Sequence, residues 1–132
     1  ISLLNEIADD IVCVRGNCEA EVDQMVLNFP LMADYIVLEN GEKLFFATHG
    51  HIYNEKKPLH VGEGNILLCG HTHVPACIKS EYVDASGKSV NFYYVNPGSV
   101  SIPKENSPHS YMLLQDGKFV WKDLVTGKEF TV

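Results

Sequence analysis

The sequence predicts an α/β fold, and three observations carry the prediction. Short apolar runs typical of buried strands each end in a glycine-containing segment that is rich in side-chain nitrogen and oxygen atoms. A stretch with helical spacing lies between two of these runs. From Ala76 onward, β-branched and aromatic residues alternate with turn signals, which is typical of consecutive strands. The 132 residues are enough for one domain with a core of its own.

The first thirty residues are expected to place one strand between two helices. Ser2–Ala8 has apolar residues at helical spacing with no capping residue before it, so it predicts the end of a helix. Ile11–Val14 is apolar throughout and predicts a buried strand. Glu19–Phe29 predicts a second helix, because acidic residues in its first turn suit the helix dipole and Pro30 ends it.

The middle of the chain is expected to form strands that lead to histidines. Tyr35–Leu38 and Lys43–Thr48 flank Asn40-Gly41, which is a hairpin signal. A polar loop from His51 to Gly64 separates this hairpin from the short apolar strand Asn65–Cys69.

The remainder is expected to be all-β. The predicted strands, which turn residues separate, are Ala76–Val83, Ser89–Val95, Ser110–Leu114, Lys118–Leu124 and a short terminal strand after Thr126-Gly127-Lys128. No repeat, low-complexity stretch or boundary interrupts the chain, so residues 1–132 are expected to form a single, partial domain.

The residues that follow Asn65–Cys69 are the strongest functional signal. Gly70 breaks the apolar run, and His71 and His73 come after it, two residues apart. In an extended chain, residues i and i+2 point to the same side, so we expect both rings to face one pocket. That pocket would lie at the carboxyl end of the strand, where open α/β sheets bind their ligands.

Two other predicted strands end in the same way. His49-Gly50-His51 follows Lys43–Thr48, and Arg15-Gly16-Asn17-Cys18 follows Ile11–Val14. Imidazole suits Zn, Mn, Fe or Ni, and an amide oxygen adds a harder ligand that favours Mn or Mg. The predicted metal ligands are Asn17, His49, His71 and His73. No aspartate follows either histidine-bearing strand, so the residues alone indicate one metal ion or half of a larger site.

Composition narrows the class of protein. The net charge of −7 disfavours binding to a nucleic-acid backbone, but an anionic substrate stays compatible because bound divalent cations reverse the local sign. No apolar run approaches the roughly 18 residues of a membrane helix, and no signal peptide opens the chain. The four cysteines form no C-x-x-C pair, so we interpret them as reduced thiols of a cytoplasmic protein rather than disulfides.

Four motifs, in this order, resemble the calcineurin-like metallophosphoesterases, and most closely their YfcE-type phosphodiesterase branch. They are Gly16-Asn17-Cys18-Glu19, Thr48-His49-Gly50-His51, Gly70-His71-Thr72-His73 and Asn96-Pro97-Gly98-Ser99. The likeness runs from Val14 to about Tyr111. It implies two β-sheets packed face to face with helices outside, and two metals bridged by a carboxylate and a water.

The resemblance also implies roles for single residues. Asn17, His49 and His71 would bind one metal ion and His73 the other, while His51 would lie beside the ligands or near the substrate phosphate as a catalytic residue. Mn is the expected metal, with Zn, Ni, Fe and Mg as alternatives, and the complete site holds two ions. These ions would clamp the oxygens of a small phosphodiester or phosphomonoester and activate a water for in-line attack.

The sequence departs from the family pattern at two places. Cys18 stands where many relatives carry a histidine that assists the leaving group, which favours diesters with good leaving groups. The family's opening Asp-x-His and Gly-Asp motifs are not in this sequence, so we expect an N-terminally truncated domain with impaired activity. The alternatives are a non-catalytic scaffold on the same fold and a mononuclear metal-binding protein.

Several residues keep two interpretations. Arg15 would contact the substrate phosphate, or it would pair with a nearby carboxylate. Cys18 would lie at the substrate, and as a thiol it is either reactive or inert. Asn96-Pro97-Gly98-Ser99 would form an anion-binding nest or a turn that supports the site. Exposed sheet edges would invite homo-oligomers.

Overall fold

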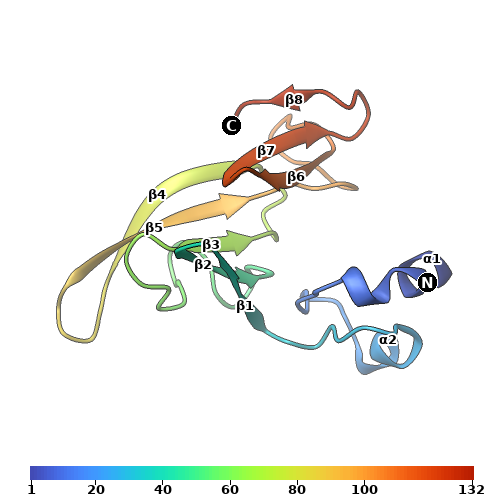
Figure 1. Cartoon of the computed structure of the whole chain (residues 1–132), viewed down its shortest axis with the longest axis horizontal. Coiled ribbons are helices and arrows are strands. Elements are labelled where there is room, and N and C mark those ends of the chain that lie inside the picture. Colours follow the sequence, from blue (N-terminus) through green and yellow to red (C-terminus); the bar gives the residue numbers. More distant parts are fainter.

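Two β-sheets form the body of the molecule in the computed structural model, which describes residues 1–132 (Figure 1). The first sheet has five strands in the order β1-β2-β3-β5-β4, and the second has three in the order β6-β7-β8. The strands are β1 (Tyr35–Asn40), β2 (Lys43–Thr48), β3 (Ile66–Cys69), β4 (Ala76–Val83), β5 (Ser89–Asn96), β6 (Ser110–Gln115), β7 (Lys118–Asp123) and β8 (Glu129–Phe130). The helical segments are α1 (Ser2–Glu6), a 3-10 turn (Ala8–Asp10) and α2 (Glu21–Val26).

The centre of the large sheet is parallel and its edges are antiparallel. β3 pairs in parallel with β2 on one side and β5 on the other, while β1 and β4 add antiparallel edges. Because the carboxyl ends of parallel strands meet at one sheet edge, the segments after β2, β3 and β5 emerge side by side. The register places Thr48 opposite Cys69 and Val95 opposite Leu68, so these three exits lie within one residue of each other.

The small sheet packs on one face of the large sheet. Trp121 of β7 lies in a buried cluster with Phe45, Ile66 and Val95 of the large sheet. The other face of the large sheet carries a second cluster, in which Val61 of the loop after β2 covers Leu67, Cys69, Phe92 and Tyr94. The expected sandwich of two sheets is therefore confirmed.

The helices lie beside the sandwich, past the β1 end of the sheet, and do not cover either sheet face (Figure 1). They form a small unit of their own, because Asn5 of α1 donates to Val26 O at 2.9 Å and accepts from Asn28 N at 2.8 Å. Phe29 and Leu31 are the buried residues beneath them.

The predicted strand Ile11–Val14 is wrong, because this segment has no regular structure and Val12 is 63% exposed. A strand needs a partner, but the backbone hydrogen bonds of this region run only from Ile11 N to Ala8 O in the preceding turn and from Arg15 N to Ala33 O. The second helix is also shorter than predicted, ending at Val26, where Leu27 takes up an extended conformation.

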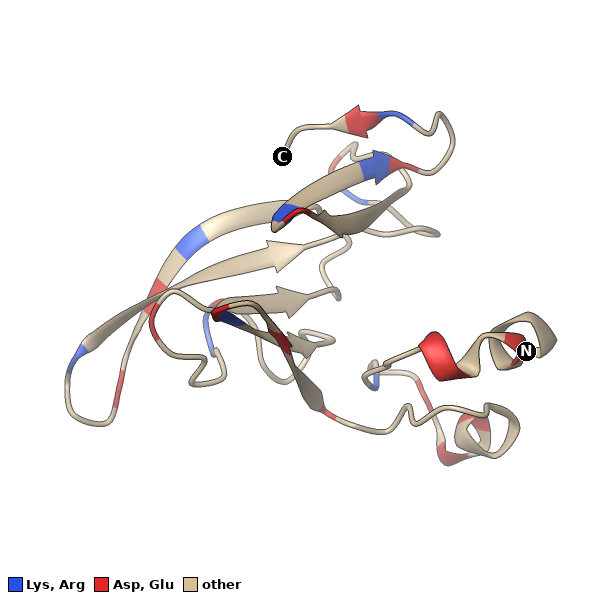
Figure 2. Ribbon diagram, in the orientation of Figure 1, with Lys and Arg blue, Asp and Glu red and all other residues tan.

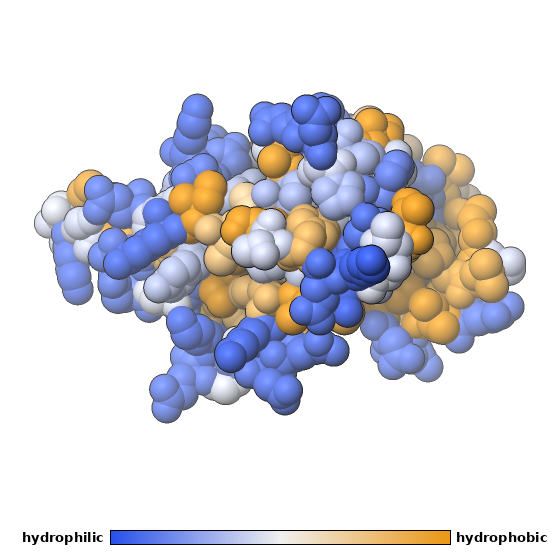
Figure 3. Space-filling view, turned by 90° about the horizontal axis from the view of Figure 1, so that it is seen from above, coloured by the Kyte–Doolittle hydropathy of each residue, from blue (hydrophilic) through white to orange (hydrophobic).

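Surface charge and hydropathy are unevenly distributed. Asp and Glu mark both the sheets and the helical unit, whereas Lys and Arg lie on the sheets and their loops, apart from Arg15 (Figure 2). Exposed apolar side chains gather at the end formed by α1 and α2 (Figure 3). The most exposed apolar residues of α1 and α2 are Leu3, Val22 and Met25, and Ile1 just before α1 is exposed as well. No helix has the length and apolar character needed to span a membrane.

Candidate functional site

The site lies at the sheet edge where β2 and β3 end. The parallel pairing continues one step beyond the strands, because Gly70 N–H donates to His49 O at 2.9 Å. This bond sets the two histidine segments side by side, and the rings of His49 and His71 lie edge to face with centroids 5.1 Å apart. The strand register thus brings together two histidines that are 22 residues apart in sequence.

Three candidate metal-ligand atoms, each from a different segment of the chain, lie close together here. Asn17 Oδ1 lies 2.9 Å from His49 Nε2, and His71 Nδ1 lies 3.2 Å from that same nitrogen. Ligands bound about 2.0–2.2 Å from a metal ion lie about 3–3.5 Å from one another, so these spacings fit a shared ion. His49 Nε2 carries either one hydrogen or one lone pair, whereas a cation would accept a lone pair from all three atoms. These two spacings are compatible with a shared divalent ion, although no three His, Cys, Asp or Glu side chains of the structure are arranged to hold a metal ion together.

The histidines after β3 do not lie in an extended chain, so the geometric premise for His71 and His73 is wrong. Both have left-handed backbones, with φ of 55° and 62°. Thr72 N–H donates to Gly70 O at 2.6 Å, which closes a tight turn of three residues with His71 at its centre. The two rings nevertheless line one cavity. The tight turn brings them there by redirecting the chain, and not the alternation of side chains along a strand.

This cavity has a volume of about 450 Å³. It is lined by His49, Gly70, His71 and His73, together with Pro97–Val100 and Ser110–Met112. His73 is fixed in it by a bond of 2.7 Å between Nδ1 and Ile102 O. The carbonyl requires a hydrogen on Nδ1, so Nε2 keeps its lone pair, which is how metal-binding histidines are commonly oriented.

His51 lies next to the candidate ligands His49 and His71 but forms no hydrogen bond with them. Its ring centroid is 5.2 Å from that of His49 and 6.3 Å from that of His71. Its Nδ1 is buried and has no hydrogen-bond partner. A buried polar atom without a partner is uncommon in native structures.

The environment of His49 favours its neutral form. Burial lowers the pKa of His49, and the neighbouring rings of His71 and His51 lower it further. A neutral imidazole keeps the lone pair that binds a metal ion.

The two predicted substrate contacts lie elsewhere. Arg15 Nη2 pairs with Asp34 Oδ1 at 2.8 Å, which matches the alternative interpretation of this residue as the partner of a carboxylate. Cys18 is exposed and lines a separate pocket with Cys13, Leu27 and Phe29. The structure brings neither side chain to the histidine cavity.

The sequence analysis gave no separate role to one residue that contacts the site. Asn96, at the end of β5, is fully buried, and its side-chain amide contacts the segment around His71. The sequence drew attention to Asn96-Pro97-Gly98-Ser99 only as a nest or a supporting turn. A signal was present, because an amide at the end of a buried parallel strand needs polar partners.

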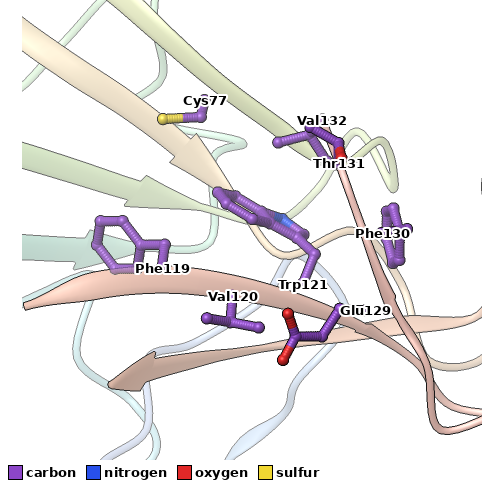
Figure 4. Close-up of a pocket in the computed structure, with 8 residues that line it drawn as sticks. All are labelled: Cys77, Phe119, Val120, Trp121, Glu129, Phe130, Thr131 and Val132. Atoms are coloured by element: carbon purple, nitrogen blue, oxygen red, sulfur yellow. The ribbon is translucent and has the colours of Figure 1, made fainter. Parts of the chain in front are cut away.

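A second cavity, of about 380 Å³, has a different character (Figure 4). It is lined by Cys77 of β4 and by residues of β7, β8 and the chain end, among them Phe119, Trp121 and Phe130. No histidine lines it.

The chain matches the model of a known superfamily over most of its length. The family model described as the calcineurin-like phosphoesterase superfamily domain matches residues 1–117. The chain belongs to this superfamily. The expectation drawn from the four ordered motifs is confirmed.

Individual calcineurin-like relatives agree with this assignment. The chain is 39% identical to the phosphodiesterase YfcE of Escherichia coli strain K12, over 86% of the chain and 56% of that relative. It is 28% identical to the probable metallophosphoesterase YsnB of Bacillus subtilis strain 168, over 76% of the chain and 54% of that relative. The chain thus spans about half the length of the curated relatives it matches.

A solved structure of YfcE, a phosphoesterase from E. coli, superposes on the calcineurin-like fold described above. The TM-score is 0.87 at 33% identity, and the match covers 98% of this chain and 66% of that one. The arrangement of the two sheets is therefore that of a known phosphoesterase.

Proposed function

We propose that this chain supplies the histidine half of a metal-dependent phosphoesterase that hydrolyses small phosphodiesters or phosphomonoesters. The observation that carries the proposal is the convergence of Asn17 Oδ1, His49 Nε2 and His71 Nδ1. The family supports it, because YfcE, a relative at 39% identity, is named a phosphodiesterase.

We assign the chain's residues as follows. Asn17, His49 and His71 hold one divalent ion, and His73 turns its Nε2 toward a second. His51, whose ring centroid lies 5.2 Å from that of His49, contacts a phosphate oxygen of the substrate. A bound divalent cation supplies Lewis-acid chemistry, which polarises a phosphoester and lowers the pKa of water.

The finer assignments are also proposals. We propose Mn as the native metal, because three imidazoles with one amide oxygen form a mixed ligand set of borderline softness. We propose two ions per complete site, small phosphoester substrates rather than nucleic acid, and a cytoplasmic location with reduced thiols. Residues 1–132 then form one partial domain.

A second candidate is a non-catalytic scaffold or a mononuclear metal-binding protein on the same fold. The observation that favours it is the lining of the histidine cavity, which includes no carboxylate. A dinuclear site needs a bridging oxygen ligand, so this chain by itself is expected to hydrolyse phosphoesters slowly or not at all.

The test is to load the purified chain with Mn²⁺, desalt it, and measure metal per chain together with hydrolysis of bis(p-nitrophenyl) phosphate. One ion per chain is expected, and it should be lost in His71→Ala. His60→Ala is the matched control, because His60 is exposed and stacks on Tyr82 away from the site. Absence of bound metal, or equal binding by His71→Ala, would overturn the proposal. One ion without hydrolysis, even after the chain is extended with the missing family motifs, would favour the mononuclear alternative.

A further inference from the structure

The backbone at His71 is held in a conformation that a histidine seldom adopts. His71 is the central residue of the three-residue turn Gly70–Thr72, with φ of 55°. Turns of this hand are rare and strained, and such strain persists only where surrounding contacts enforce it. His71 is itself exposed, so packing around its side chain does not supply that enforcement. The constraint has to come from the residues on either side of it.

Asn96 contacts both of those residues. Its Nδ2 donates to Gly70 O at 2.7 Å and to Thr72 Oγ1 at 3.0 Å. Gly70 O is the same oxygen that accepts the closing bond of the turn from Thr72 N–H. One amide group therefore bridges the two ends of the turn, with His71 between them.

Asn96 is itself fixed from three directions. Its side chain has no exposed surface, and its Oδ1 accepts from Gly98 N at 2.9 Å. Its backbone carbonyl accepts the indole N–H of Trp121 at 2.9 Å, which ties it to the small sheet. Tyr94 Oη also lies 3.1 Å from Nδ2, so the two hydrogens of Nδ2 are shared among three acceptors. A buried amide with all its polar atoms satisfied is a rigid anchor.

We propose that Asn96 is a positioning residue, which holds the strained turn at His71 and thereby sets the direction of the metal-binding nitrogen. It touches none of the reacting atoms and acts through the backbone of Gly70 and the hydroxyl of Thr72. The part of the proposal that concerns metal rests on the proposed function. The part that concerns the turn stands without it.

Two variants and one control separate positioning from general stability. Asn96→Asp keeps the size of the side chain and Oδ1 but removes both hydrogens that reach the turn. Thr72→Val removes one acceptor at an exposed position and leaves Asn96 intact. Tyr94→Phe is the control, because it deletes the third contact of Nδ2 and keeps both contacts with the turn.

The first measurement is amide hydrogen exchange by NMR on the metal-free chain. We expect the Thr72 N–H of Asn96→Asp to exchange at least about tenfold faster than in the unchanged chain, while amides of β3 and β5 keep their protection. Thr72→Val should change in the same direction by less, and Tyr94→Phe should not change. Unchanged exchange at Thr72 in a folded Asn96→Asp chain overturns the proposal. If Asn96→Asp does not fold, unchanged exchange in Thr72→Val overturns it.

The second measurement is the affinity for Mn²⁺ by calorimetry. Loss of a group that orients a ligand commonly costs about 10–100-fold in metal affinity, and we expect this range for Asn96→Asp. Tyr94→Phe should bind as the unchanged chain does. If the unchanged chain binds no Mn²⁺, the proposed function fails and the exchange measurement still decides whether Asn96 holds the turn. If it binds and Asn96→Asp binds equally well, the positioning role fails alone.

Discussion

Gly50 shows how little room a single residue has in this site. It lies between His49 and His51 with φ of 112°, a conformation that glycine adopts without a steric penalty. A Cβ built on it would lie 3.1 Å from Cβ of His71. Any side chain at this position therefore meets the second histidine segment.

We predict that Gly50→Ala weakens metal binding as well as the fold. Strain at such a φ costs about 1–3 kcal/mol, and the displaced His71 should lower Mn²⁺ affinity in calorimetry. Gly41→Ala is the matched control, because Gly41 also has a positive φ but nothing lies within 4 Å of its Cβ position. The control should lose about 1–2 kcal/mol in chemical denaturation and bind metal normally. Equal metal affinities for both variants would contradict the prediction.

The cysteines differ in reactivity because of where they lie. Cys69 is 2% exposed, and burial raises the pKa of its thiol to about 12, whereas Cys18 and Cys77 are exposed. The thiolate is the reactive form, so Cys69 should resist Ellman's reagent at pH 8 until the chain unfolds. We predict rapid labelling of Cys18 and Cys77 in the native chain and of all four thiols in guanidinium. Rapid labelling of Cys69 in the native chain, located by mass spectrometry, would contradict the prediction that this thiol is buried and unreactive.

Among the elements, strands were predictable where two signals coincide. β1 and β2, and likewise β6 and β7, were found because runs of apolar residues flank a turn dipeptide. Ile11–Val14 carried only the apolar signal, and four apolar residues do not reveal whether a partner strand lies alongside. β-Pairing is a long-range property, so this element could not be settled locally.

The candidate site likewise has features that the sequence predicts and features that it does not. Histidines beside glycines at strand ends were visible in the sequence because their pattern repeats. The left-handed turn at His71 was not, since no local rule places a histidine at positive φ. The contacts of Asn96 were also hidden, because they join residues 24 and 26 positions apart.

The hairpin between β4 and β5 should be sensitive to acid. Asp84 accepts from Ser86 Oγ at 2.6 Å and from the amides of Ser86 and Lys88, and these bonds, that of the Ser86 hydroxyl foremost, lower the pKa of Asp84. Because the pKa of Asp84 is lowered by folding, the stabilisation that its ionised carboxylate contributes is complete above the ordinary carboxyl pKa of about 3.9. This stabilisation is lost as the pH falls through the pKa of Asp84 in the folded chain.

We therefore predict that Asp84→Asn reduces the fall of the melting temperature between about pH 5 and 3 relative to the unchanged chain. Asp116→Asn is the control, because it removes the same charge from an exposed residue of the β6–β7 turn. Calorimetric melting across this pH range is the measurement. Identical pH profiles for the two variants would assign the acid sensitivity to overall charge instead of to this turn.

At the scale of the whole molecule, the helical end exposes a large apolar surface. Leu3 is 75% exposed and Met25 is 82% exposed, and they lie on the two helices that form this end (Figure 3). Apolar patches of this kind commonly mark association surfaces. The unpaired outer edges of β1 and β4 add a second route to association.

We predict concentration-dependent self-association, reduced by Met25→Lys. Val83→Lys is the control, since Val83 is 67% exposed but lies at the end of β4, at the opposite end of the molecule. Sedimentation equilibrium should give a lower average mass for Met25→Lys and no change for Val83→Lys. A monomer at all concentrations in the unchanged chain would contradict this prediction.

The contact between Asn17 and His49 has a consequence for the shape of the molecule. It is the only hydrogen bond that joins residues 1–31 to residues 35–132. A ligand that binds only the joined arrangement favours it by RT ln(1 + [L]/Kd), about 2.7 kcal/mol at a hundredfold excess over Kd. An ion held by Asn17 and His49 would therefore link the helical unit to the sandwich and stabilise their relative arrangement. Chelation should let the two parts separate, and small-angle X-ray scattering should record this as an increase in the radius of gyration.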